Sequence, residues 1–176
     1  MNYDIKMVAV DIDGTFVHSD YTYDILRFQR ILSRMNDAGC HFVVASGNQY
    51  YQLRDLFPGY YNELSFVAEN GAFVKDGQEL IFTANIPKDT VDAVIDVCRD
   101  YPEISNVLCG VESAYCQRGT VSQEFFDLTA IYYHRLKWVD DFKPEALFVA
   151  VSDHSFVYKI SLRIAKKYNI PIYFYY

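Results

Sequence analysis

The sequence predicts an α/β fold: a parallel sheet core, followed by a second module of mixed α+β character. Apolar strands alternate with helical patterns over residues 8–57, which is typical of a parallel sheet. These strands are apolar almost throughout, as in strands that are covered on both faces. From Ile86 the pattern changes, and we therefore expect a core over residues 1–84 and a second module over residues 85–176.

In the core we expect strand, helix, strand, helix, strand and hairpin, in that order. The first helix has apolar residues at three- and four-residue steps, and Gly39 is a good stop for it. The second helix is expected to start at the polar turn Ser46–Asn48 and to end before Pro58. The expected strands are 8–11, 41–45, 64–68 and a hairpin of 72–74 with 80–82 around Asp76-Gly77.

In the second module, Pro87 is expected to open a helix with an apolar face. A helix around residues 122–130 is indicated in the same way, and a last helix follows Asp153. The expected strands are short apolar runs, at 105–109, 113–116, 131–139, 146–151 and 171–176.

Two aspartates close the first strand, in the run Val8-Ala9-Val10-Asp11-Ile12-Asp13-Gly14-Thr15. Alternation along a strand puts both carboxylates on the same face, where they repel each other. A cation relieves that repulsion, and hard oxygen ligands suit Mg²⁺. Gly14 lets the backbone turn sharply, and successive N–H groups of the turn with Thr15 can hold a phosphate. The pattern indicates a Mg²⁺ and phosphate site; its alternative is a solvated acidic turn.

The second strand ends at Ser46-Gly47-Asn48, next to the first strand in the expected sheet. Ligands of open parallel sheets bind beyond the carboxyl ends of the strands, so both motifs point to one place. The N–H groups of Gly47 and Asn48 at a helix start suit an anion. Ser46 by itself is typical of an ordinary helix N-cap. Beside the two aspartates, phosphate binding becomes the better interpretation.

Three further residues are candidates for a substrate pocket. Asn70 lies in Asn70-Gly71, which is equally typical of a plain turn. His134 and Arg135 lie in the second module. They fit either a contact to the sugar or phosphate of a substrate, or exposed positions on a strand.

Composition narrows the classes of protein. The 176 residues are 51% apolar, which is enough for one domain or one domain with a small partner. A net charge of −7 argues against a nucleic-acid partner. The start shows no signal peptide, and no apolar stretch of about 18 residues suggests a membrane span. The four cysteines match no zinc pattern, and we expect reduced thiols in a cytoplasmic protein.

The motifs resemble a known family. The chain is similar to the haloacid dehalogenase-like superfamily in its Cof-type branch, and within that branch to bacterial sugar phosphatases. The resemblance implies a Rossmann-like core with an inserted cap domain that closes over the active site and selects the substrate. It is carried by residues 10–15, 42–53 and 66–72, the middle segment being long and specific, and more weakly by 109–115 and 133–137.

The resemblance also implies a phosphoric monoester hydrolase. Asp11 would be the nucleophile that forms an aspartyl-phosphate, and Asp13 would be the general acid and base. Mg²⁺ would lie between the Asp11 carboxylate and the Asp13 backbone carbonyl, and Ser46 would hold a phosphate oxygen. The residue types agree: a carboxylate is a competent nucleophile, and repulsion from Asp11 would favour a protonated Asp13.

The chain departs from the family in one respect. A complete Cof-type enzyme returns from the cap to the core, where it supplies a lysine and a Gly-Asp-x-x-Asn-Asp motif; this sequence has no Gly-Asp dipeptide. We therefore expect the amino-terminal portion of a phosphatase. Its Asp11 strand would be an exposed sheet edge that favours self-association.

The expected function is Mg²⁺-dependent hydrolysis of small phosphorylated metabolites, sugar phosphates first among them. Two alternatives stay open: a phosphatase of a phosphorylated cofactor, and a catalytically inactive remnant that binds phosphate or a partner.

Overall fold

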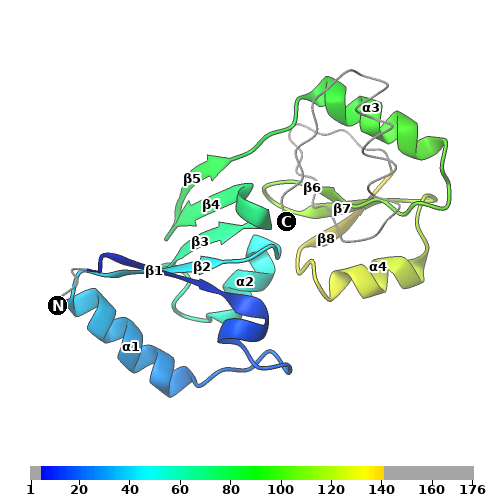
Figure 1. Cartoon of the computed structure of the whole chain (residues 1–176). Helices are drawn as coiled ribbons and strands as arrows, with labels where there is room; N and C mark the ends of the chain where they lie inside the picture. The colour runs from blue at the N-terminus through cyan, green and yellow to red at the C-terminus, as the bar shows by residue number, and fades with distance from the viewer. Residues whose placement is uncertain (1–4, 141–176) are drawn as a thin grey trace.

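The computed structural model describes residues 5–140, which form a five-stranded and a three-stranded sheet (Figure 1). The large sheet comprises β1 (Met7–Asp11), β2 (His41–Ala45), β3 (Ser65–Ala68), β4 (Phe73–Asp76) and β5 (Glu79–Thr83), with α1 (Ile25–Asp37) and α2 (Tyr50–Leu56). The small sheet comprises β6 (Leu108–Cys109), β7 (Ala114–Gln117) and β8 (Leu136–Val139), with α3 (Lys88–Arg99) and α4 (Gln123–Ala130). Two short turns, η1 (Ile12–Phe16) and η2 (Glu69–Gly71), follow β1 and β3.

The predicted α/β class is confirmed. The large sheet has the order β1-β2-β3-β4-β5, in which β1, β2 and β3 run parallel. The helices α1 and α2 make the two crossovers that parallel strands require. The expected hairpin forms β4 and β5, which pair antiparallel. In Figure 1 the small sheet lies between α3 and α4.

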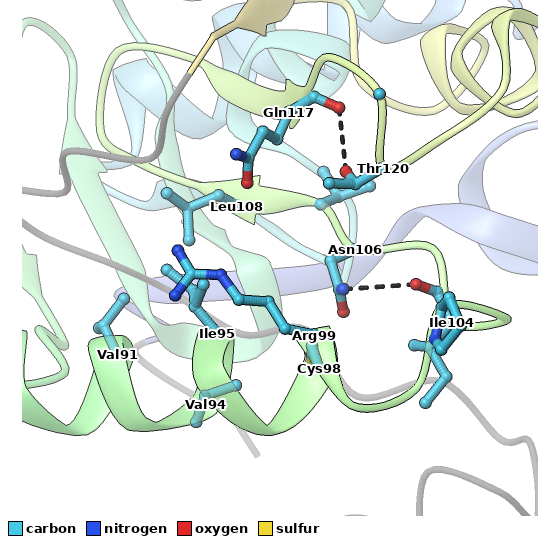
Figure 2. Close-up of a pocket in the computed structure, with 13 residues that line it drawn as sticks. Val91, Val94, Ile95, Cys98, Arg99, Ile104, Asn106, Leu108, Gln117 and Thr120 are labelled. Atoms are coloured by element: carbon cyan, nitrogen blue, oxygen red, sulfur yellow. Dashed lines mark hydrogen bonds between the residues drawn. The ribbon is translucent and has the colours of Figure 1, made fainter.

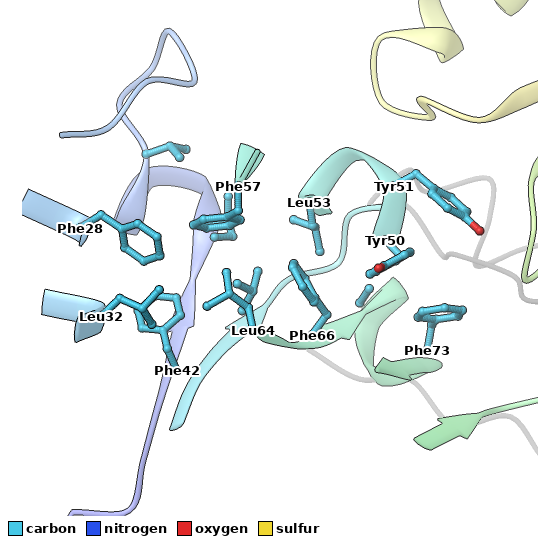
Figure 3. Close-up of a cluster of buried hydrophobic side chains, with 14 residues drawn as sticks. Phe28, Leu32, Phe42, Tyr50, Tyr51, Leu53, Phe57, Leu64, Phe66 and Phe73 are labelled. Atoms are coloured by element: carbon cyan, nitrogen blue, oxygen red, sulfur yellow. The ribbon is translucent and has the colours of Figure 1, made fainter. Parts of the chain in front are cut away.

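The core lies on one face of the large sheet. Alternate residues of β2, Phe42 and Val44, point to this face and meet Phe66 of β3. Figure 3 shows how α1 covers them with Phe28 and α2 with Leu53 and other side chains. The buried cluster comprises Ile12, Val17, Phe28, Leu32, Phe42, Val44, Tyr50, Tyr51, Leu53, Phe57, Leu64, Phe66, Ala68 and Phe73. Both helices therefore pack on the same face of the large sheet.

The ends of the helices carry residues that commonly cap helices. The carboxylate of Asp24 accepts a hydrogen bond of 2.8 Å from the N–H of Arg27 and caps α1. Gly39 has a φ of 63°, the left-handed conformation that commonly follows a helix. Ser122 caps α4 by accepting from the N–H of Phe125 at 3.0 Å.

Three expected element bounds are wrong. The strand expected over 105–109 is formed only by β6. The second helix begins at Tyr50 rather than at the Ser46 turn, because the intervening backbone hydrogen-bonds to neighbouring segments: Ser46 N–H donates to Val67 O, and Asn48 O accepts from Glu69 N–H. The strand expected over 131–139 is formed only by β8. Its first residues continue the turn after α4, since the N–H groups of Tyr132 and Tyr133 both donate to Thr129 O.

The elements expected at 146–151, after Asp153 and at 171–176 lie outside the described residues. The domain boundary expected between residues 84 and 85 stays a prediction. Among residues 5–140, no helix is both long and apolar enough to cross a membrane. The cysteines at 40, 98, 109 and 116 are unpaired, as expected.

Candidate active site

The two predicted motifs meet at the carboxyl edge of the large sheet. Asp11, the last residue of β1, pairs in parallel register with Ala45, the last residue of β2. Ser46 therefore leaves β2 directly beside the point where the chain turns into η1. Gly14 in that turn has a φ of 71°, which suits glycine far better than any residue with a side chain.

The carboxylate of Asp13 is held from two sides. Its Oδ1 accepts a hydrogen bond of 2.9 Å from the hydroxyl of Tyr21. Its Oδ2 accepts one of 2.8 Å from Nδ2 of Asn48. The loop after β1 is thus tied to the loop after β2. Thr15 bonds the other aspartate, with Oγ1 lying 3.4 Å from Oδ2 of Asp11.

Tyr21 is a contact that the sequence analysis missed. The hydrogen bond to Asp13 raises the pKa of the Tyr21 hydroxyl above its ordinary value. An exposed tyrosine between polar residues gives no periodic signal. The left-handed backbone conformation that brings Tyr21 to Asp13 cannot be predicted from the residue type.

The loop from Ser46 to Asn48 is compact and contacts η2. Ser46 Oγ accepts from the N–H of Asn48 at 3.1 Å, so the hydroxyl braces its own loop. A Cβ on Gly47 would lie 2.7 Å from Oδ1 of Asn70, so a larger residue at 47 would force the Asn70 side chain to move. Asn70 therefore does reach the predicted site, although it also sits in the plain turn that its sequence suggests.

Glu69 lies behind this loop and was also missed. Its N–H donates to the carbonyl of Asn48 at 3.1 Å, and its φ is 52°, unusual for a residue with a side chain. Burial raises the pKa of its carboxyl to about 7. Cys109 and Tyr133 are close enough that, besides burial, the Glu69 charge raises the pKa of each. One partly buried carboxyl thus lies near Cys109 and Tyr133 of the small-sheet half.

His134 and Arg135 lie against α2. Nδ1 of His134 lies 2.9 Å from Oδ2 of Asp55. Burial disfavours the charged Asp55, but hydrogen bonds from His134 and Arg54 outweigh it and lower the pKa of Asp55. Within residues 5–140, no hydrogen bond or ion pair joins His134 or Arg135 to the aspartates at β1.

Arg135 makes four contacts near α2. Its N–H donates to Oε1 of Gln49 at 3.1 Å, and its carbonyl accepts from Nε2 of Gln49 at 3.4 Å. Its guanidinium lies 3.8 Å from the centroid of the Tyr51 ring and 3.6 Å from Oε2 of Glu112. The hydroxyl of Tyr51 donates to the carbonyl of Val111 at 3.2 Å. These contacts join the small sheet to the large one.

A cavity of about 320 Å³ opens between the two sheets, next to Asn48. Its described lining is uncharged and rich in aromatic rings, and comprises Gly47, Asn48, Gln49, Val107, Phe125, Thr129, Tyr132 and Tyr133. Because Asn48 bonds Asp13, a molecule in this cavity would lie beside the aspartates.

A second cavity, of about 300 Å³, lies within the small-sheet half of the described chain (Figure 2). Val91 and Ile95 of α3 face Leu108 of β6 across it. No described lining residue comes from the large sheet or its loops. It is therefore not a candidate for the phosphate site.

The carboxylates suit a hard cation, but they are few. Asp11 and Asp13 offer oxygen atoms of the kind that Mg²⁺ prefers. No group of three or more His, Cys, Asp or Glu side chains is placed to hold a metal within residues 5–140. Water and backbone oxygens would have to complete an octahedral shell here.

Comparison with known proteins identifies the family. The model of the family described as "haloacid dehalogenase-like hydrolase" matches residues 8–172, and the chain belongs to this family. The resemblance expected from the sequence is thereby confirmed.

One curated relative is 5-amino-6-(5-phospho-D-ribitylamino)uracil phosphatase YbjI of Escherichia coli K12. It is 41% identical over 138 residues, which cover 78% of this chain and 51% of that protein. The chain thus spans about half the length of this relative.

Solved structures agree on the fold. SMU.1108c from Streptococcus mutans UA159 has a TM-score of 0.72 at 34% identity, covering 82% of this chain and 55% of that one. The sugar phosphatase BT4131 has a TM-score of 0.53 at 18% identity, covering 76% and 52%. At that identity the second likeness concerns the fold alone.

Proposed function

We propose that this chain carries the catalytic aspartates of a phosphatase that hydrolyses phosphate monoesters of small metabolites. The observation that supports it best is the Asp13 carboxylate, held by Tyr21 and Asn48 beside Asp11 at the sheet edge. In a member of the haloacid dehalogenase-like hydrolase family, this arrangement supports Asp11 as the nucleophile and Asp13 as the proton carrier, at the sheet edge where ligands of such sheets bind.

In this proposal Asp11 attacks phosphorus and the leaving oxygen takes a proton from Asp13. Asp13 then accepts a proton from the water that hydrolyses the aspartyl-phosphate. Gly14, Thr15, Ser46, Gly47 and Asn48 would offer N–H and hydroxyl groups to the phosphate. Asn70, whose side chain lies against Gly47, would border the same pocket.

Asp11, through its carboxylate, and Asp13, through its backbone carbonyl, would hold Mg²⁺. When bound, Mg²⁺ supplies positive charge that offsets the repulsion between the carboxylate and the phosphate.

The small-sheet half acts in this proposal as the cap. The uncharged cavity between the sheets takes the part of the substrate beyond the phosphate. His134 and Arg135 then fix the cap to α2, in place of the substrate contact first considered.

The relative YbjI is named for a substrate with a phosphorylated ribityl chain on a uracil ring. That name supports a phosphorylated sugar alcohol or sugar as the substrate class. We also place the protein in the cytoplasm, where its unpaired cysteines stay reduced.

The test is phosphate release with Mg²⁺ from a panel of sugar and sugar-alcohol phosphates. We expect turnover that Asp11→Asn and Asp13→Asn each lower by a factor of about 100 or more, because the first loses the nucleophile and the second the proton carrier. Near wild-type turnover in Asp11→Asn would refute the nucleophile. No turnover, with phosphate still bound, would favour the inactive binding remnant.

A further inference from the structure

Tyr21 occupies a conformation that its own packing does not explain. Its φ is 60°, a left-handed value that a residue with a bulky side chain seldom adopts. A tight turn holds it there: His18 N–H donates to Thr22 O, and Tyr21 N–H donates to His18 O, each at 2.9 Å. Asp20 closes the same turn with two hydrogen bonds to Thr22.

The neighbouring Tyr23 shows what an aromatic residue of this loop does when it serves the core. Its ring packs against Phe16 and Phe57, and its hydroxyl donates to the carbonyl of Leu56 at 2.9 Å. Tyr21 instead remains 42% exposed. Burial of its ring is thus a weak reason for the left-handed backbone.

What the conformation achieves is the contact to Asp13. The Tyr21 hydroxyl lies 2.9 Å from Oδ1, while Nδ2 of Asn48 lies 2.8 Å from Oδ2. A carboxyl group held through both oxygens cannot rotate freely about its Cβ–Cγ bond. Asn48 comes from the neighbouring strand's loop, so the two donors approach from different segments.

We propose that Tyr21 is a positioning residue for Asp13, holding its carboxyl in the orientation that delivers a proton to the leaving oxygen of the substrate. This inference rests on the proposed function. As the bond from Asp11 to phosphorus forms, the bond from phosphorus to the leaving oxygen breaks. Its electron pair goes to that oxygen, which takes the proton of Asp13. A misaligned carboxyl slows this step.

The step depends on the leaving group. An alkoxide such as that of a sugar alcohol leaves poorly without a proton, whereas 4-nitrophenolate leaves readily without one. In kcat/KM, which covers the steps up to departure of the leaving group, a residue that acts through the proton donor affects the first kind of substrate alone. A residue that merely supports the fold affects both kinds equally.

The first measurement compares kcat/KM of Tyr21→Phe with that of the unmodified chain. For a sugar-alcohol phosphate we expect a fall of about tenfold, which lies within the usual effect of losing one hydrogen bond. For 4-nitrophenyl phosphate we expect a change within about twofold. Tyr115→Phe, which removes the same hydroxyl from β7 in the small sheet, is the matched control and should change neither value.

The second measurement needs no turnover. The ¹³C signal of the Asp13 carboxyl, assigned by its loss in Asp13→Asn, should shift or broaden in Tyr21→Phe and stay unchanged in Tyr115→Phe. Circular dichroism and thermal unfolding verify that both variants are folded.

The outcomes separate this inference from the proposed function. An unchanged Asp13 signal in Tyr21→Phe, or equal losses with both substrates, would overturn the role of Tyr21. A wild-type chain without turnover, but with an Asp13 signal that moves in Tyr21→Phe, would overturn the proposed function and leave Tyr21 holding Asp13.

Discussion

At the scale of single residues, Glu69 couples the stability of the chain to pH. In the unfolded chain its carboxyl titrates near 4.5, and in the folded chain near 7 because burial disfavours the charge. Below pH 4.5 both states hold the proton. Between pH 4.5 and 7 only the folded chain holds it, so the free energy of unfolding falls by up to about 1.4 kcal/mol per pH unit. Above pH 7 the loss is complete.

Glu69→Gln should therefore flatten the pH dependence of stability between pH 5 and 7. Urea unfolding across that range measures it. Glu63→Gln is the control, since Glu63 is exposed and its removal should leave the slope in place. The Cys109 thiol and the Tyr133 hydroxyl, which lie near Glu69, stay protonated through this window and add no slope of their own. An equal slope in wild type and Glu69→Gln would show that the Glu69 carboxyl is not buried in solution.

Some site residues could be read from the sequence and others could not. Asp11 and Ser46 follow strands, and parallel pairing alone carries both to one edge. Tyr21 and Glu69 reach the site through left-handed backbone at residues with side chains. Such conformations are stabilised by the surrounding tertiary structure, so they cannot be predicted from the residue type.

At the scale of elements, α2 is one part of the core that contacts the small-sheet half. Gln49, the N-cap residue of α2, is 4% exposed and makes two hydrogen bonds to the backbone of Arg135. Gln49→Ala should lower the free energy of unfolding by about 1 kcal/mol, since the Arg135 N–H loses its hydrogen-bond partner, whereas the Arg135 carbonyl still accepts from the N–H of Ala114. It should also speed hydrogen exchange at the Arg135 amide.

Gln78→Ala is the control for Gln49→Ala. Gln78 lies exposed in the turn between β4 and β5, so its removal should alter neither stability nor exchange at Arg135. Unchanged exchange at Arg135 in Gln49→Ala would mean that the two sheets are not joined through this pair in solution.

The element order was predictable because apolar periodicity reflects burial, as in β2, where Phe42, Val43 and Val44 are all buried. The start of α2 was not, because backbone bonds from Ser46 to Val67 and from Glu69 to Asn48 hold the chain extended there. Such bonds join residues that lie some twenty positions apart. A pattern read within a short window does not contain them.

At the scale of the whole molecule, β1 is an edge strand of the described large sheet. Met7 is 60% exposed and Val8 is 38% exposed along it. An unpaired, apolar edge is a template for another strand, so we predict self-association that grows with concentration. Sedimentation should show species heavier than the 20.5 kDa monomer.

Met7→Lys should shift that equilibrium toward the monomer, because charge on an edge strand opposes pairing. Leu26→Lys is the matched control: Leu26 is 68% exposed, but it lies on α1, away from the sheet edge. A wild-type chain that sediments as a monomer at every concentration would rule out association through β1.

The pair between Gln49 and Arg135 has a consequence for how this chain can vary. Both hydrogen bonds of Gln49 go to the main chain of residue 135, not to the guanidinium. The contact is therefore indifferent to the side chain at 135, and proline is the one residue excluded outright, since it has no N–H to donate. Relatives can thus exchange the residue at 135, and with it the charge near Tyr51, while the amide at 49 preserves the junction between the sheets.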